Sequence, residues 1–210
     1  MSPTNGIKLL LLDMDGTLTT VKSPWQFVHE QIGTWEKVGK ALLARFLANE
    51  ITYQQFCEGD AKAYREAGFS LDQIVDVINT IPIPPATLEF LEYAINVDAR
   101  PVIISTGFTF TAERFLNALN LHPKAVDIIA NSLVEQDGLV VPRLSVVDGD
   151  PACGKGAWAR KMIAQHNVPR EAVGAVGDSE ADRPMFEAAG QFFKVRGPQD
   201  LLNIPWFKVE

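Results

Sequence analysis

The spacing of apolar residues changes twice along the chain, near residues 20 and 100. Leu9 to Leu12 form an unbroken apolar run, which is typical of a strand buried on both faces of a parallel sheet. Residues 21–83 instead have apolar positions three or four apart and no strand pattern. From residue 101 onward, short apolar runs alternate with helical segments. We therefore predict an α/β protein whose parallel sheet is built from residues 1–20 and 84–210, with an inserted all-α cap at residues 21–83.

Individual elements follow from the same spacing. Helices are expected at residues 25–31, 34–48, 53–67, 71–80, 84–96, 111–121, 155–166 and 183–189. Further strands are expected at 101–104, 127–130, 173–176 and 191–195, and a hairpin at 133–141 around Asp137-Gly138.

Local signals mark several helix starts. Thr34 is a candidate N-cap, and two helices begin with the spacing of a capping box, Thr52-x-x-Gln55 and Ser70-x-x-Gln73. Near the end of the chain, Trp206 and Phe207 are expected to pack on the core.

Two carboxylates, Asp13 and Asp15, follow the first strand directly, next to Gly16-Thr17. Ligands of open α/β sheets bind at this carboxyl edge of the strands. A single acid there could be a turn residue or a helix cap, but two acids this close repel each other unless a cation or a shared proton compensates. The pair predicts a metal and catalytic site.

Other strand ends carry polar groups as well. Ser105-Thr106-Gly107 offers hydroxyls and an amide that suit an anion, although a simple helix cap explains it equally well. Gly177-Asp178 begins a cluster of acids that reaches Asp182, which could serve only as a cap. Lys155 lies in a glycine-flanked turn before a helix. Together, Asp13, Asp15 and Asp178 suit a hard cation, and magnesium is favoured over zinc because no His or Cys lies near them in the motifs.

One motif competes with this interpretation. Residues 149–155 match G-x-x-x-x-G-K, the beginning of a phosphate-binding P-loop. The next residue is Gly156 instead of the Ser or Thr that ligates magnesium, and Pro151 removes an amide from the loop. A nucleotide triphosphatase is therefore the weaker hypothesis.

Composition limits the partners of the protein. The chain has 210 residues, 47% of them hydrophobic, and a formal net charge of −7, which argues against nucleic acid or an anionic membrane. Cys57 and Cys153 form no disulfide framework, and we find no signal peptide and no membrane span, so we expect a cytoplasmic protein. The oligomeric state is not predicted.

The four strand-end motifs resemble those of the haloacid dehalogenase superfamily: Asp13-Met-Asp15-Gly-Thr17, Ser105, Lys155, and Gly177-Asp178 with Asp182. They occur in the family's order and span almost the whole chain. The resemblance implies a Rossmann-like core and a magnesium-dependent phosphomonoesterase that acts on a small phosphorylated metabolite. An acid at position 15 is typical of phosphatases and mutases in this superfamily.

The resemblance also implies roles for single residues. Asp13 would be the nucleophile that forms an aspartyl-phosphate, and Asp15 the general acid and base. Asp13, Asp178 and the main-chain carbonyl of Asp15 would hold Mg²⁺. The phosphoryl oxygens would bind Ser105-Thr106-Gly107 and Lys155, and Asp182 would orient Lys155 or waters of the metal.

A helical insertion after the first motif is similar to that of the phosphoserine phosphatase group, but the residues expected to bind substrate differ. Lys22 replaces the Glu that would hold the substrate's amine, and the segment where a carboxylate-binding Arg is expected carries Glu58 and Asp60, with Arg45 or Arg65 as possible substitutes. Gly16 stands where that group more often has Ser. Phosphoserine is therefore one candidate substrate among several.

The candidates for substrate specificity in the cap are Lys22, Trp25 and His29. Trp25 and His29 lie four apart on one predicted helical face, so they could line the mouth of the pocket, or they could pack against neighbouring helices. Two alternatives to hydrolysis stay open, a phosphotransferase or mutase that uses the same intermediate, and a module that binds a phosphorylated ligand without turnover.

Overall fold

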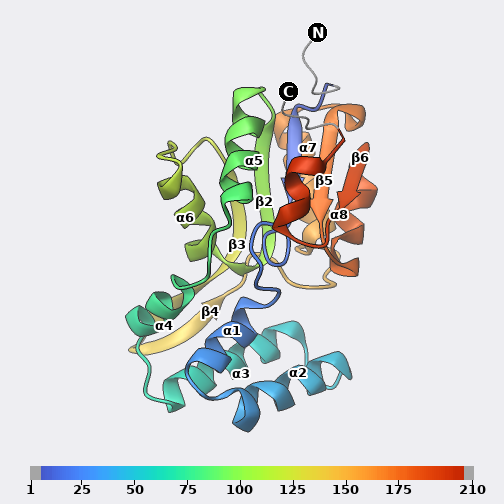
Figure 1. Ribbon diagram of the computed structural model, residues 1–210. Coiled ribbons are helices and arrows are strands. Elements are labelled where there is room, and N and C mark those ends of the chain that lie inside the picture. The colour runs from blue at the N-terminus through green and yellow to red at the C-terminus, as the bar shows by residue number, and fades with distance from the viewer. Residues whose placement is uncertain (1–5, 206–210) are drawn as a thin grey trace.

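The computed structural model describes residues 6–205, which form a six-stranded sheet with helices on both faces and a separate group of helices at one end (Figure 1). The strand order is β4-β3-β2-β1-β5-β6. The strands are β1 (Leu9–Leu12), β2 (Arg100–Phe108), β3 (Asp127–Gln136), β4 (Leu139–Arg143), β5 (Val173–Gly177) and β6 (Gln191–Lys194). All neighbours pair in parallel except β3 and β4, which form the antiparallel hairpin. The predicted α/β class is confirmed.

Alternate residues of the central strands supply two hydrophobic cores. Leu10 and Leu12 face α5 (Pro85–Asn96) and α6 (Thr109–Ala118). Leu9 and Leu11 face α7 (Lys155–His166) and α8 (Arg183–Ala188). Because both faces of β1 are buried, this strand has no polar position, and only its ends are open to solvent.

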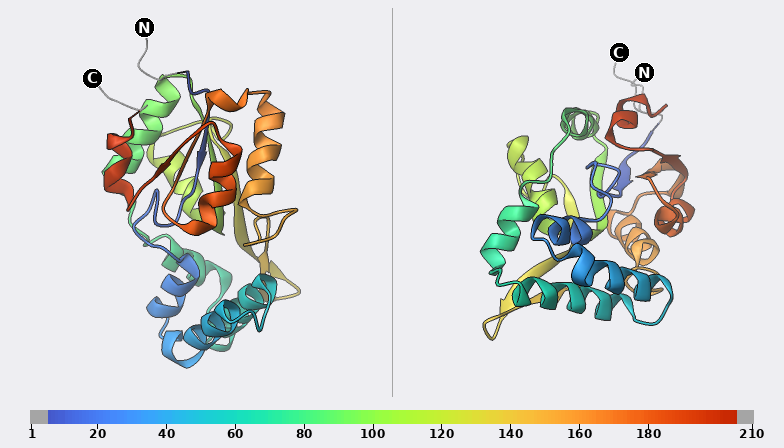
Figure 2. Two further views of the ribbon diagram at one scale, coloured as in Figure 1. Left: turned by 90° about the vertical axis from the view of Figure 1, so that its right-hand side faces the viewer. Right: turned by 60° about the horizontal axis from the view of Figure 1, so that its bottom comes forward.

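The helices of the predicted cap lie below the carboxyl ends of the strands (Figures 1 and 2). They are α1 (Pro24–Gln31), a π-helical turn (Trp35–Gly39), α2 (Lys40–Leu47), α3 (Tyr53–Glu66) and α4 (Leu71–Ile78). Both predicted capping boxes, at Thr52 and at Ser70, are formed. The limits of the cap as a structural unit, residues 21–83, stay a prediction.

The structure differs from the predicted helix at 34–48. Thr34 makes no capping hydrogen bond, because its hydroxyl instead lies 2.7 Å from Nδ1 of His29. The first turn is widened to a π-helix beside the same ring, and a Cβ on Gly39 would lie 2.8 Å from it. A buried polar contact therefore replaces the expected cap.

The β3–β4 hairpin extends beyond the sheet to the helical end (Figure 2). Leu133 and Val140 are buried in the same cluster as α3 residues, and Arg65 of α3 donates a hydrogen bond to the carbonyl of Val140. The helical group therefore rests on the hairpin as well as on its chain connections.

One remaining difference concerns the length of a strand. The strand expected at 101–104 continues to Phe108, so Ser105-Thr106-Gly107 belongs to β2 itself. Trp206 and Phe207 lie outside the described residues. Within residues 6–205, no helix combines the length and the hydropathy that crossing a membrane requires.

Candidate active site

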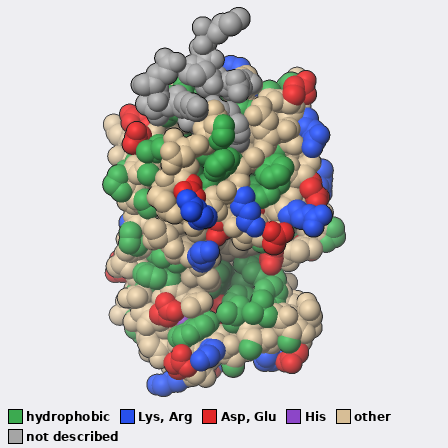
Figure 3. All heavy atoms as spheres, turned by 45° about the vertical axis from the view of Figure 1, so that its right-hand side comes forward, with side chains coloured by type: hydrophobic (Ala, Val, Ile, Leu, Met, Phe, Trp, Pro, Cys, Tyr) green, Lys and Arg blue, Asp and Glu red, His purple; other side chains and the backbone are tan. Residues whose placement is uncertain are grey.

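The sheet places the predicted site residues together at its carboxyl edge. Asp13 and Asp15 follow β1, Asp178 follows β5, and Lys155 is the first residue of α7. Asp13, Asp15 and Lys155 are all buried, with at most 8% of each residue exposed. Between the sheet and the helical group the surface is hollowed, with hydrophobic side chains gathered on the helical side and charged ones on the sheet side (Figure 3).

Asp13 is fixed by two donors. Lys155 Nζ lies 2.5 Å from its Oδ1, and the Thr17 hydroxyl donates to its Oδ2 at 2.9 Å. Burial raises the pKa of Asp13 to about 6, although Lys155 counteracts this. Thr17 belongs to the predicted motif, where it has no assigned role. Its position four residues after Asp13, in a tight turn, is the sequence signal for this hydrogen bond.

Asp15 lies beside the end of β2. Ser105 Oγ donates to Asp15 Oδ2 at 2.7 Å, and the Gly107 amide donates to Ser105 Oγ at 2.8 Å. The other oxygen, Oδ1, is buried and has no hydrogen-bond partner among the described residues. Burial, with repulsion from Asp13, raises the pKa of Asp15 to about 7.

Glycine is required at two places around these acids. A Cβ on Gly107 would lie 2.1 Å from Asp15 Oδ2, and a Cβ on Gly16 would lie 2.5 Å from Asp178 Oδ2. Gly16 also has φ +85°, a region that side chains disfavour. The Gly-Thr turn after Asp15 thus allows the carboxylates to approach one another.

Asp182 holds the lysine in place. Its Oδ1 lies 2.5 Å from Lys155 Nζ, and its Oδ2 accepts from the Asp178 amide and from the amide and hydroxyl of Ser179. Burial by itself lowers the pKa of Lys155, but the carboxylates of Asp13 and Asp182 outweigh it and raise that pKa above its usual value. The ammonium group therefore stays charged.

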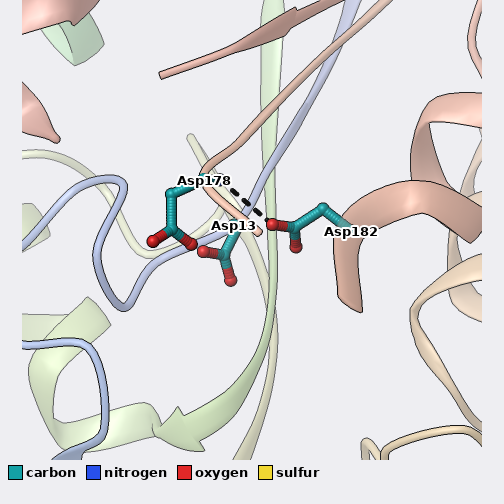
Figure 4. A group of neighbouring side chains, drawn as sticks. All are labelled: Asp13, Asp178 and Asp182. Carbon is teal, nitrogen blue, oxygen red and sulfur yellow. Dashed lines mark hydrogen bonds between the residues drawn. The ribbon is translucent and has the colours of Figure 1, made fainter. Parts of the chain in front are cut away.

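Three carboxylates, those of Asp13, Asp178 and Asp182, point into one space, each with an oxygen within 4.8 Å of the others (Figure 4). Asp182 already accepts four hydrogen bonds, whereas Asp13 accepts one on each oxygen, which leaves Asp13 and Asp178 as the candidate ligands. An all-carboxylate set with excess negative charge fits a hard divalent cation such as Mg²⁺. Lys22 Nζ also lies near this set, 3.4 Å from Asp178 Oδ2.

The other two specificity candidates, Trp25 and His29, have different hydrogen-bond partners. Trp25 is buried, and its indole N–H donates to the carbonyl of Thr106 at 3.2 Å. His29 is enclosed by the helices, bonded to Thr34 and to Asp60 at 2.9 Å. His29 thus follows the packing alternative and does not line a pocket mouth.

The residues considered for binding a substrate carboxylate have other partners. Arg45 pairs with Glu50, and Arg65 bonds to the hairpin. In the P-loop-like segment, the Asp150 carboxylate accepts hydrogen bonds from the amides of Ala152 and Cys153. Those amides are therefore not arranged around a phosphate.

The raised pKa values predict how stability depends on pH. Both acids bind protons more tightly in the folded state, so metal-free protein should lose stability as pH rises from about 4 to 7. Asp15→Asn removes a cost of about 4 kcal/mol at pH 8, the equivalent of its shift from 3.8 to about 7. We expect its melting temperature in chelator to exceed that of the wild type by roughly 10 °C at pH 8 and to match it at pH 4.

The control for this comparison is Asp98→Asn. The side chain of Asp98 is exposed, and among the described residues it forms an ion pair with the exposed Lys8. Thermal unfolding at pH 4, 6 and 8 measures the effect. Equal pH slopes for Asp15→Asn and the wild type would contradict the assigned burial of this charge.

Comparisons with known proteins agree with this geometry. The family model of haloacid dehalogenase-like hydrolases matches residues 10–187. The phosphoserine phosphatase of Idiomarina loihiensis is 24% identical over 183 residues, which cover 86% of this chain and 78% of that protein. The phosphoserine phosphatase of Archaeoglobus fulgidus is 23% identical over 185 residues, covering 87% of this chain and 51% of that relative.

The fold is also similar to a solved structure described as a phospho-aspartyl intermediate analogue of phosphoserine phosphatase. The TM-score is 0.72 at 20% identity, and the alignment covers 94% of this chain and 90% of the other. The chain belongs to the haloacid dehalogenase-like hydrolases and is a phosphatase, similar in sequence and in fold to phosphoserine phosphatases.

Proposed function

We propose that the protein hydrolyses a small phosphate monoester through an aspartyl-phosphate on Asp13, with Mg²⁺ bound. The observation that carries the proposal is the pair of buried acids beside Lys155. Asp13 accepts hydrogen bonds from the Lys155 ammonium and the Thr17 hydroxyl, which favour its ionised form. Burial and repulsion from Asp13, in contrast, raise the pKa of Asp15 to about 7 and favour its protonated form. A carboxylate nucleophile and a neutral acid are what the first step requires.

In the first step an oxygen of Asp13 attacks phosphorus, the P–O bond to the leaving group breaks, and Asp15 gives its proton to the leaving oxygen. In the second step Asp15 takes a proton from water as that water attacks the aspartyl-phosphate, which releases phosphate and restores Asp13. Lys155 and the Ser105-Thr106-Gly107 segment would bind the phosphoryl oxygens throughout, with the Gly107 amide holding the Ser105 hydroxyl.

Asp13, Asp178 and the main-chain carbonyl of Asp15 would hold the magnesium ion. When bound, the ion supplies positive charge that offsets the charge of the phosphoryl group. Asp182 would act through Lys155, since the four hydrogen bonds that it accepts leave its oxygens little capacity for the ion. A cytoplasmic location and the cap limits stay predictions, as do the roles of single residues.

The substrate is proposed only by class. Relatives named phosphoserine phosphatases act on a small phosphorylated amino acid, so phosphoserine is one candidate. Lys22 beside Asp178 places a cation where a substrate ammonium group would be repelled. Phosphate monoesters without an amine, such as sugar phosphates and phosphorylated acids, are therefore included as candidates.

The test is phosphate release from phosphoserine, several sugar phosphates and an aryl phosphate. With magnesium we expect turnover of at least one ester, and with chelator a fall of about a hundredfold that added magnesium reverses. Added sugar acceptors distinguish the alternative, since a phosphotransferase would form new sugar phosphate. Binding of a phosphorylated ligand without release from any ester would instead favour the binding module and overturn the proposal.

A further inference from the structure

Three side-chain donors meet at one backbone carbonyl, that of Thr106. Trp25 Nε1 lies 3.2 Å from it, Tyr53 Oη 3.1 Å and Asn131 Nδ2 3.0 Å. The three come from different elements: α1, α3 and β3. One carbonyl oxygen has two lone pairs, so this convergence is unusual for a residue within a strand.

This carbonyl belongs to the peptide unit that carries the Gly107 amide. No cis peptide bond occurs among the described residues, so the Thr106 carbonyl and the Gly107 N–H point to opposite sides of one rigid plane. Fixing the carbonyl from one side therefore fixes the direction of the N–H on the other. That N–H points to Ser105 Oγ, which in turn donates to Asp15.

The backbone around this peptide is less regular than in the rest of β2. Residue 107 is glycine, whose backbone is the least restricted, and the strand pairing of β2 with β3 shifts register between Ile104 and Phe108. Trp25 also packs on Phe108, with ring centroids 4.6 Å apart. The side chains around Thr106 thus replace regular sheet hydrogen bonds as the source of rigidity.

We propose that Trp25 and Tyr53 are positioning residues, which hold the Thr106–Gly107 peptide so that its N–H keeps Ser105 Oγ in place beside Asp15, at the phosphate site. Asn131 supplies the same support from the sheet. It is fully buried, its Nδ2 also donates to Val146, and its Oδ1 accepts from the amides of Ser145 and Val146. Because Trp25 and Tyr53 lie on α1 and α3, the helical group takes part in binding phosphate without touching it.

The inference rests on the proposed function, because it takes Ser105, held by the Gly107 N–H, as a group that binds phosphate. Its test uses Tyr53→Phe and Trp25→Phe, which remove the donors and keep aromatic rings. Each has a matched control. Tyr64→Phe removes a hydroxyl that donates to the Trp25 carbonyl at 2.8 Å, and Trp158→Phe removes an indole N–H that donates to the Ser145 carbonyl at 2.7 Å.

The probe is inorganic phosphate as a competitive inhibitor of the best substrate, at fixed magnesium. We expect its inhibition constant and KM to rise roughly fivefold in Tyr53→Phe and in Trp25→Phe, and to change less than twofold in both controls. Each of the four variants loses one hydrogen bond to a backbone carbonyl. Thermal unfolding of all four therefore shows how much of a change in the inhibition constant follows from lower stability and how much from lost positioning.

The outcomes are distinct. A wild type that releases phosphate while Tyr53→Phe and Trp25→Phe keep its inhibition constant would overturn the inference and leave the proposed function standing. Equal rises in test and control variants would also overturn it, because the effect would then follow stability. A wild type that neither turns over esters nor binds phosphate would overturn the proposed function itself, and the inference with it.

Discussion

Asp13→Asn should abolish phosphate release, with a loss of roughly five orders of magnitude in kcat, the scale on which enzymes lose rate when a covalent nucleophile is removed. Asparagine keeps the shape of the side chain, its Oδ1 can still accept a hydrogen bond from Lys155, and its amide nitrogen can donate to the Thr17 hydroxyl, so the site should stay folded. What it loses is the negative oxygen that attacks phosphorus.

The measurement is phosphate release together with acid-quenched mass spectrometry of the intact chain. The wild type under turnover should carry one phosphoryl group, and Asp13→Asn none. Asp98→Asn, on the exposed surface, controls for the substitution itself. Release by Asp13→Asn within tenfold of the wild type would show that water attacks the ester directly, and the aspartyl-phosphate mechanism would be wrong.

Asp15→Asn should lower kcat by about 10²- to 10⁴-fold, the usual contribution of general acid–base catalysis. The two steps should respond differently to the leaving group. A nitrophenolate leaves without a proton, so formation of the phosphoenzyme from an aryl ester should be slowed far less than its formation from an alkyl ester. Hydrolysis of the phosphoenzyme needs the base with either ester, so phosphorylated protein should accumulate with the aryl ester.

Rapid-quench kinetics with both esters measures this difference. Ser105→Ala is the informative companion, because it removes the hydrogen bond to Asp15 and keeps the carboxyl group. It should lower the rate less than Asp15→Asn does. Equal slowing of phosphoenzyme formation with aryl and alkyl esters in Asp15→Asn would contradict the role of Asp15 as the acid.

Much of the site could be predicted because it depends on strand ends. A parallel sheet brings the carboxyl ends of its strands to one edge, so Asp13, Ser105 and Asp178 meet wherever the strands are ordered in this way. Capping boxes are equally local, and both were confirmed.

The parts that were missed depend on contacts between distant segments. The helical face alone left His29 between a pocket mouth and packing against helices, and only the fold shows that Asp60, 31 residues away, lies against it. The same contact explains the absent cap at Thr34. Tyr53 and Asn131 lie 78 positions apart, and no local pattern indicates that both reach Thr106.

The β3–β4 hairpin constrains how the site can be reached. A helical group joined to the sheet by two chain crossings alone could lift away in any direction, but the hairpin buries Leu133 and Val140 against it on one side. Separation there would expose apolar surface, so we expect the helical group to hinge about the hairpin when it opens for substrate. We then expect substrate to enter through the hollow between the sheet and the helical group (Figure 3).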